Sequence, residues 1–138
     1  MNLYLAGPFF NEEQVALLEK LERILFNKGL NVFSPRKHMS KLPFGTFQWQ
    51  NENFIIDANA LQYSDIILAV YNDQDPGTMW EVGYAWAIKK IIIIFNTKEN
   101  VLNLMITQSL HAYLDSLDKV IHYNFNKLPR IFYEGNVT

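Results

Sequence analysis

Two acidic residues, Glu81 and Asp57, are of the type and setting that displacement chemistry at a glycosidic carbon requires. Such chemistry commonly uses one carboxylate as the nucleophile and a second carboxylic acid that protonates the leaving group. Asp57 lies in an otherwise apolar stretch, where a carboxylate is costly unless it is paired or functional. Asp75, in the turn Asp75-Pro76-Gly77, is a third acidic candidate.

The same residues also fit purely structural roles. Thr78-x-x-Glu81 matches a capping box, in which Glu81 would only bond the backbone N–H of Thr78. Asp75 before Pro76-Gly77 is an ordinary turn residue. A helix N-terminus close to Glu81 would, however, help to hold that carboxylate ionised, as a nucleophile must be. The local pattern leaves both interpretations open.

Aromatic residues follow the first apolar segment and could line a pocket for a neutral sugar–base substrate. Phe9 and Phe10 come directly after Gly7-Pro8, although such phenylalanines are more often core residues than residues that stack on a ligand. Tyr4 lies inside the apolar segment, which favours the core, and Asn103 is most simply the cap of a following helix.

Apolar runs alternate along the chain with segments of helical periodicity. The strands and helices that these patterns predict must position the candidate side chains. We expect strands over residues 2–6, 30–33, 65–71, 91–95 and 110–114, and helices over 11–28, 50–63, 78–88, 101–109 and 116–124. This order predicts an α/β fold: a doubly wound, five-stranded parallel sheet of flavodoxin-like (Rossmann-like) order with helices on both faces. Residues 36–48 are expected to form a long loop that covers a site. Ligands of such sheets bind beyond the carboxyl ends of the strands, which selects the loops after the first, third and fourth strands.

Composition narrows the function classes. With 138 residues, of which 49% are hydrophobic and 19% charged, the chain is expected to form one globular domain over residues 1–138. The net charge is −2 without a block of Lys or Arg, so we expect no nucleic-acid partner. The absence of Cys, of paired His and of glycine-rich phosphate motifs disfavours thiolate, metal and dinucleotide or P-loop chemistry. No signal-peptide pattern and no apolar run near the ~20 residues of a membrane span is visible, so a cytoplasmic protein is expected.

Several segments together resemble the nucleoside 2-deoxyribosyltransferase family. The matching segments, in chain order, are Leu3-Tyr4-Leu5-Ala6-Gly7-Pro8-Phe9-Phe10, Asp57, Ser64-Asp65-Ile66-Ile67-Leu68-Ala69-Val70-Tyr71, Asp75-x-Gly77-x-x-x-Glu81-x-Gly83-Tyr84-Ala85, Asn103-Leu104-Met105, Asn124-Phe125-Asn126-Lys127 and Phe132-Tyr133-Glu134-Gly135. The resemblance covers nearly the whole chain, but it does not extend to the loop from Arg36 to Gln48.

The resemblance implies a catalytic set. Glu81 would attack the anomeric carbon of a 2′-deoxynucleoside and form a deoxyribosyl-enzyme ester. Asp57 would manage the proton of the leaving and entering base, and Asp75 would bond the sugar hydroxyls and help to position Glu81. The substrates implied are small 2′-deoxynucleosides and free bases, and no cofactor is used.

The resemblance also implies a binding set. Tyr4 would lie near the sugar and Phe9 beside the base, with Gly7 and Phe10 in the same loop. Family members are typically homo-oligomers, often hexamers built from dimers, with sites shared between subunits. The segment with Asn103 and Met105, together with the C-terminal end, would reach the site of a neighbouring subunit.

Two alternatives remain at this point. A 2′-deoxynucleoside 5′-monophosphate N-glycosidase would use a similar glutamate. It would also need Ser, Gly and Arg donors to bind the phosphate, where this chain has Gly7-Pro8-Phe9-Phe10. A non-catalytic nucleotide-binding domain is compatible with the same fold, although it leaves the three carboxylates without a role.

Overall fold

Five short apolar segments form a parallel sheet in the computed structural model, which describes residues 1–138. The strands are β1 (Asn2–Ala6), β2 (Asn31–Phe33), β3 (Ile66–Val70), β4 (Ile91–Phe95) and β6 (Ala112–Leu114). Their order in the sheet is β2-β1-β3-β4-β6, and every neighbouring pair is parallel. The predicted flavodoxin-like α/β order is therefore confirmed.

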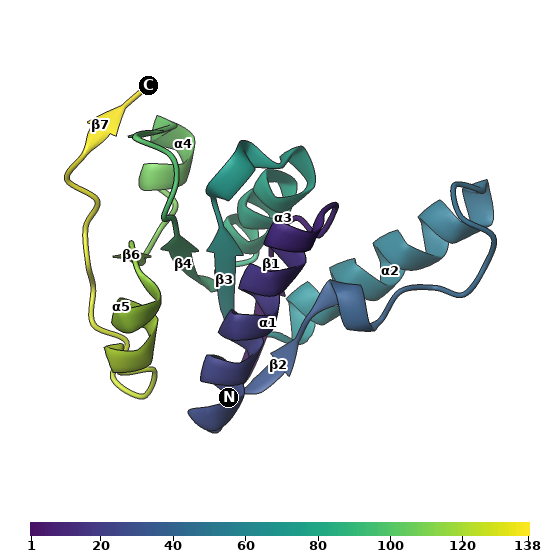
Figure 1. Ribbon diagram of the computed structural model, residues 1–138, viewed down its shortest axis with the longest axis horizontal. Helices are drawn as coiled ribbons and strands as arrows, with labels where there is room; N and C mark the ends of the chain where they lie inside the picture. Colours follow the sequence, from purple (N-terminus) through teal and green to yellow (C-terminus); the bar gives the residue numbers. More distant parts are fainter.

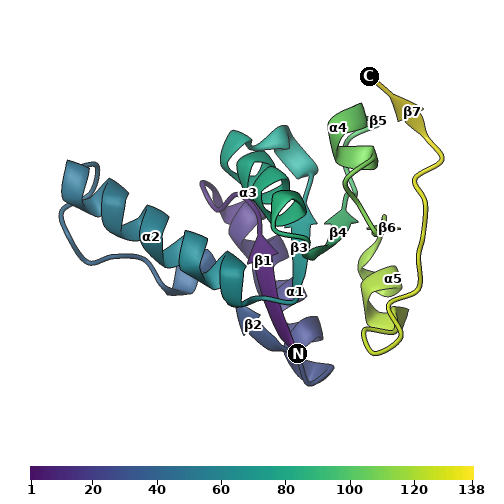
Figure 2. The same ribbon diagram turned by 180° about the vertical axis from the view of Figure 1, so that it is seen from behind.

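Helices cover both faces of this sheet. Helices α1 (Glu12–Asn27) and α5 (Leu117–His122) lie on the face seen in Figure 1, and α2 (Phe47–Tyr63) and α3 (Pro76–Ala87) lie on the face seen in Figure 2. Two separate apolar clusters, one on each face, fill the space between the sheet and its helices. The sheet is buried on both faces, as its near-continuous apolar strands require.

Successive side chains of β1 point to opposite faces of the sheet, so they are divided between the two apolar clusters. Leu3 and Leu5 point toward α1, whereas Tyr4 and Ala6 point toward α2 and α3. This alternation places the hydroxyl of Tyr4 on the side of the sheet where α3 begins.

Helix α2 and the segment before it differ from the prediction in their bounds. The helix expected from Gln50 begins three residues earlier, at Phe47, because the Thr46 hydroxyl caps it by accepting from Trp49 N at 3.2 Å. The expected loop is interrupted by one turn of 3₁₀ helix, η1 (Pro35–Lys37). The N-terminal half of α2 extends away from the sheet as an arm (Figures 1 and 2).

The prediction of a helix over residues 101–109 is wrong in its first part. Residues Val101–Leu102 form a strand, β5, which pairs in parallel with β7 (Asn136–Val137). Helix α4 (Leu104–Thr107) begins only after Asn103, whose side chain accepts from Met105 N at 2.8 Å, so Asn103 is a helix cap as predicted. The pairing partner lies more than thirty residues away in sequence, so local periodicity could not indicate it.

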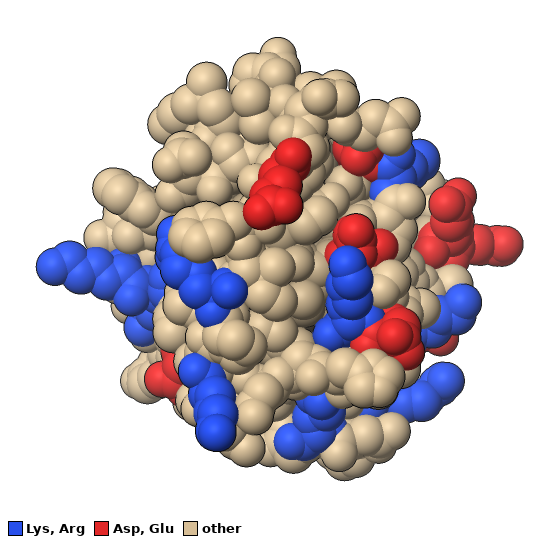
Figure 3. Space-filling view, turned by 90° about the vertical axis from the view of Figure 1, so that its left-hand side faces the viewer, with Lys and Arg blue, Asp and Glu red and all other residues tan.

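Charge is unevenly placed on the face that carries α5 and β7. Basic and acidic side chains are interspersed over its lower part, and its upper part is mostly uncharged (Figure 3). Exposed apolar side chains near α4 and β7 include Val101, Leu104, Met105 and Val137. No helix of the structure is long and apolar enough to span a bilayer.

Gly7, directly after β1, is a position where the fold has no room for a side chain. A Cβ there would lie 3.0 Å from Leu18 Cδ2 and 3.2 Å from Val70 Cβ. We expect Gly7→Ala to lower the free energy of unfolding by about 1–3 kcal/mol through overpacking, measured by urea denaturation. Gly83→Ala is the matched control, because nothing lies within 4 Å of its added Cβ. Alanine there should stabilise α3 by roughly 0.5–1 kcal/mol, and equal effects of the two changes would refute the packing argument.

Candidate active site

Four segments meet at the carboxyl edge of the sheet and line a cavity of about 340 Å³. They are the loop after β1, the start of η1, the middle of α2 and the first two turns of α3 with its cap. The lining residues are Gly7, Pro8, Phe9, Phe10, Pro35, Phe54, Asp57, Ala58, Asp75, Gly77, Trp80 and Glu81. The structure thus brings together all three predicted carboxylates and three members of the predicted binding set.

The start of α3 explains where Glu81 points. Asp75 is the N-cap, and its Oδ2 accepts from both the backbone N and the hydroxyl of Thr78, each at 2.8 Å. Pro76 occupies the first helical position, which suits its fixed φ. The predicted start at Thr78 is therefore two residues late, and the capping-box interpretation of Glu81 is wrong. Glu81 lies in the second turn and is free to face the cavity.

Tyr4 and Glu81 are in direct contact between β1 and α3. The Tyr4 hydroxyl donates a hydrogen bond to Oε2 of Glu81, from a ring that is completely buried. Phe33 stacks on Tyr4 with ring centroids 5.4 Å apart, and His38 stacks on Phe33 at 4.4 Å. Tyr4 is consequently a core residue and a site residue at once, two roles that the sequence presents as alternatives.

Burial sets the protonation of the acidic residues. Burial raises the pKa of Glu81 to about 8, and the charges of Asp57 and Asp75 add to the effect. The hydrogen bond from Tyr4 acts in the opposite direction, because it favours the ionised carboxylate. Burial also raises the pKa of Asp57 to about 6. The pKa of Tyr4 is raised as well, by burial and then by the charge of Glu81, so its hydroxyl remains a donor.

Two pairs of aromatic side chains line the same cavity as the carboxylates. Phe9 and Phe10 stack with centroids 6.1 Å apart, and Phe10 is 78% exposed. Phe54 of α2 meets Trp80 of α3 edge to face, with centroids 5.3 Å apart. Phe54 and Trp80 were missed in the sequence as site residues. The available signal was their spacing, since Phe54 precedes Asp57 by three residues and Trp80 precedes Glu81 by one.

Asn103 and Met105 do not line this cavity. They lie in a separate hollow of about 640 Å³ between α3 and α4, together with Trp86. The backbone N–H of Asn103 donates to the Tyr71 hydroxyl at 3.0 Å, and Met105 is 68% exposed. Within one chain these two residues thus line a different hollow from Glu81.

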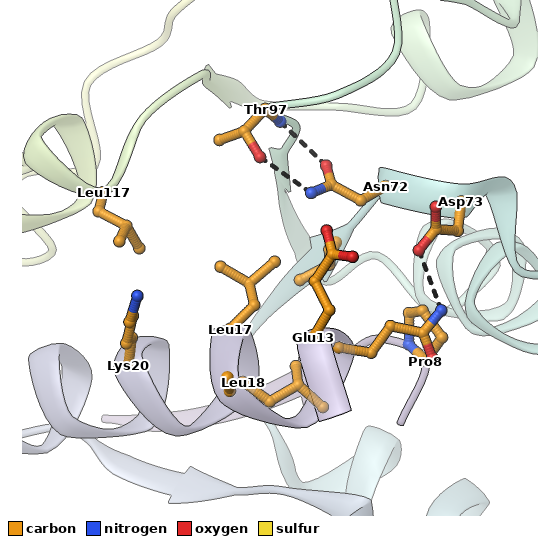
Figure 4. Close-up of a pocket in the computed structure, with 12 residues that line it drawn as sticks. Pro8, Glu13, Leu17, Leu18, Lys20, Asn72, Asp73, Thr97 and Leu117 are labelled. Atoms are coloured by element: carbon orange, nitrogen blue, oxygen red, sulfur yellow. Dashed lines mark hydrogen bonds between the residues drawn. The ribbon is translucent and has the colours of Figure 1, made fainter. Parts of the chain in front are cut away.

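A third hollow lies on the α1 side of the carboxyl edge of the sheet, and the segment that leads from β3 into α3 forms part of its wall (Figure 4). Asn72 and Thr97 bond reciprocally, and Gln14 donates to Asp73 at 2.9 Å. Asp73 and Gln74 adopt positive φ values of 69° and 49°, which non-glycine residues rarely do without support from their surroundings. These bonds therefore fix the path of the chain from β3 to Asp75. No group of three or more His, Asp or Glu side chains is arranged to hold a metal ion.

The raised pKa of Glu81 makes a stability prediction that is independent of any reaction. The ordinary pKa of a glutamate is 4.5. Between that pH and about pH 8, the Glu81 carboxyl is ionised in the unfolded chain but still protonated in the folded one. The free energy of unfolding therefore falls as pH rises through this range. One pKa unit corresponds to about 1.4 kcal/mol, and Glu81→Gln should raise the free energy of unfolding by about 1–3 kcal/mol at roughly pH 9. Below about pH 4 the two proteins should be equally stable.

Urea denaturation of both proteins across this pH range checks the expectation. Glu134→Gln, at an exposed position, is the control and should show no pH-dependent difference. A gain in Glu81→Gln that is the same at both pH values would show that ionisation of Glu81 is not its source.

Comparison with known proteins gives a consistent result. Residues 3–121 match the family described as nucleoside 2-deoxyribosyltransferase. A nucleoside deoxyribosyltransferase of Limosilactobacillus fermentum is 31% identical over 144 aligned positions, which cover 90% of this chain and 86% of that protein.

Solved structures extend this result to the fold. The 2-deoxyribosyltransferase of the psychrotolerant bacterium Bacillus psychrosaccharolyticus superposes with a TM-score of 0.90 at 37% identity, over 97% of this chain and 100% of that one. A CMP N-glycosidase of Clostridium botulinum superposes with a TM-score of 0.63 at 22% identity, over 87% of this chain and 98% of that one. At that lower identity the likeness concerns the fold alone.

Proposed function

This chain belongs to the nucleoside 2-deoxyribosyltransferase family, and we propose that it moves 2-deoxyribose from a 2′-deoxynucleoside to a free base through an ester on Glu81. The observation that carries the proposal is the contact between Glu81 and Tyr4 in a cavity that also holds Asp57. One carboxylate is held by a neutral donor, and a second one with a raised pKa lies nearby.

The reaction consists of two displacements at one carbon. An oxygen of ionised Glu81 attacks the anomeric carbon, the C–N glycosidic bond breaks, and the departing base takes a proton from Asp57. A nitrogen of the incoming base then attacks the same carbon, the ester bond breaks and releases Glu81, and that nitrogen's proton returns to Asp57. Two inversions give net retention and ping-pong kinetics.

The hydrogen bond from Tyr4 makes the two carboxylate oxygens of Glu81 different from each other. The Tyr4 hydroxyl occupies Oε2, so Oε1 is the oxygen left to attack. The transition state resembles an oxocarbenium ion, which an adjacent carboxylate stabilises electrostatically. The lack of a 2′-hydroxyl makes that cation easier to form and favours deoxyribosyl donors. Apolar walls from Phe9 and Phe54 keep water from the ester, so that a base captures it.

Asp75 and a second subunit complete the proposed site. Asp75 uses one oxygen to cap α3, which leaves Oδ1 for a sugar hydroxyl. Asn103 and Met105 would reach the sugar bound by a neighbouring copy, and the exposed apolar side chains near α4 and β7 give that copy a surface to pack on. A phosphate-binding N-glycosidase is less well supported, because the loop Gly7–Phe10 offers no hydroxyl or guanidinium donor.

Base exchange tests the reaction and its nucleophile together. Incubation with 2′-deoxyinosine and adenine should give 2′-deoxyadenosine and hypoxanthine, resolved by chromatography. Glu81→Ala should lower the rate by at least about a thousandfold, because no ester can form. Glu19→Ala, an exposed glutamate on α1, is the control and should leave the rate unchanged. Free deoxyribose without a transfer product would instead identify a hydrolase, and binding without turnover would identify a non-catalytic domain.

The pH dependence of kcat/KM tests the role of Asp57. The pair holds one proton between pKa values of about 6 and about 8. The higher pKa of Glu81 places that proton mainly on Glu81, so the reactive form, with Asp57 protonated and Glu81 ionised, is the minor of the two one-proton states. The wild-type profile should therefore be bell-shaped, with limbs near those values.

Asp57→Asn cannot donate a proton, so its rate should fall by about 10²–10⁴-fold and then depend only on ionisation of Glu81. Its kcat/KM should rise with pH to a plateau, without the alkaline limb. Initial rates from acid to alkaline buffers measure this, with Asp118→Asn at an exposed position as the control. An alkaline limb that persists in Asp57→Asn would assign the proton transfer to another group.

A further inference from the structure

We propose that Trp80 is the stacking surface for the base and that it makes the enzyme favour purines over pyrimidines. The inference rests on the proposed function, since it names the substrate class of the same cavity. It starts from the edge-to-face pair of Phe54 and Trp80, which lies beside the two carboxylates.

Neighbouring side chains hold the indole of Trp80 in place. Tyr84, one turn further along α3, stacks on it with centroids 5.3 Å apart and an interplanar angle of 17°. The Tyr84 hydroxyl in turn accepts a hydrogen bond from Gln62 Nε2 at 2.7 Å, which ties the stack to α2. The indole nevertheless remains 49% exposed and lines the cavity. A large aromatic ring is therefore fixed from behind while part of it stays accessible.

The position of Trp80 matches where the base must lie. The base departs from the anomeric carbon at Glu81 and must lie within reach of the proton on Asp57. Trp80 adjoins Glu81 in sequence, and Phe54 lies on the same face of α2 as Asp57, three residues earlier. The aromatic pair thus lies beside Asp57, where the base must be, and Phe9 and Phe10 line the same cavity.

Stacking on such a ring discriminates by ring size. Stacking of a base on an aromatic side chain is worth about 5- to 150-fold in affinity, and every base has a π-face. A purine has two fused rings and overlaps an indole more than a single-ring pyrimidine does. Loss of the indole should therefore affect purines more strongly than pyrimidines.

A role in helix packing alone would have a different signature. Trp80 and Phe54 also join α3 to α2, and loss of that packing would lower stability and affect every substrate alike. The ratio of kcat/KM for a purine acceptor to that for a pyrimidine acceptor separates the two roles.

The experiment compares adenine and cytosine as acceptors with one donor. Trp80→Leu retains apolar bulk without a π-face, and we expect it to lower kcat/KM for adenine about tenfold or more and for cytosine at most about threefold. Trp80→Phe, which restores a smaller ring, should recover part of the adenine rate. Phe26→Leu, an exposed aromatic position on α1, is the matched control and should change neither rate. Equal losses for both bases, or no loss, would overturn the inference.

Binding without turnover keeps this inference distinguishable from the proposed function. In Glu81→Gln, calorimetric affinity for 2′-deoxyadenosine should fall about tenfold or more when Trp80→Leu is added and by a smaller factor when Trp80→Phe is added, and affinity for 2′-deoxycytidine should fall less in each case. If wild type shows no base exchange but this selective loss is seen, the proposed function fails and the stacking role stands. If exchange occurs and the loss is not selective, the stacking role fails alone. Should Trp80→Leu not fold, the Trp80→Phe measurements decide.

Discussion

The contact between a buried tyrosine hydroxyl and a glutamate that shares its cavity with two other carboxylates constrains the whole site. Tyr4 can reach Glu81 only because β1 alternates its side chains and turns this one toward α3. Glu81 can reach Tyr4 only because α3 begins at Pro76, capped by Asp75, which places residue 81 one turn inside the helix. A shift of one residue in either element would turn one partner away. The stack of Phe33 and His38 against Tyr4 fixes the remaining freedom of the tyrosine ring.

The surroundings of this contact work against the stability of the ionised carboxylate. Burial and the charges of Asp57 and Asp75 all raise the pKa of Glu81, and only Tyr4 opposes them. A buried carboxyl group that resists ionisation is costly to the fold, and such a cost is common at active sites. For the proposed role of Glu81 as a nucleophile, the same environment would make the carboxylate reactive when it is ionised. The left-handed backbone at Asp73 and Gln74 is a second local cost, which Gln14, Lys98 and Glu99 offset by hydrogen bonds.

Much of this arrangement could be predicted from local pattern, and each exception has its own physical cause. Apolar runs such as Ile66–Val70 and Ile91–Phe95 indicate buried strands by themselves, and the alternation with helices leaves few sheet orders. The carboxyl-edge rule then brings Asp75 and Glu81 together with Gly7. Strand β5 was missed because its partner β7 is distant in sequence, and the start of α3 was misplaced because two residues, Asp75 and Thr78, both suit a cap. Trp80 could not be assigned, because a tryptophan on a helix has the same pattern whether it faces a core or a ligand.

The order in which the chain is made gives the Tyr4–Glu81 contact a particular place in folding. Strand β1 is synthesised first, yet it lies inside the sheet, and its pairing with β3 joins Leu3 to Ile66. The hydroxyl contact of Tyr4 spans 77 residues, so a large loop must close before Glu81 meets its partner. Until then the carboxylate remains hydrated and its desolvation cost is absent. Strand β1 can pair with β2 once residues 31–33 have been made, whereas the contact with Glu81 must await β3 and α3, which come later in the chain.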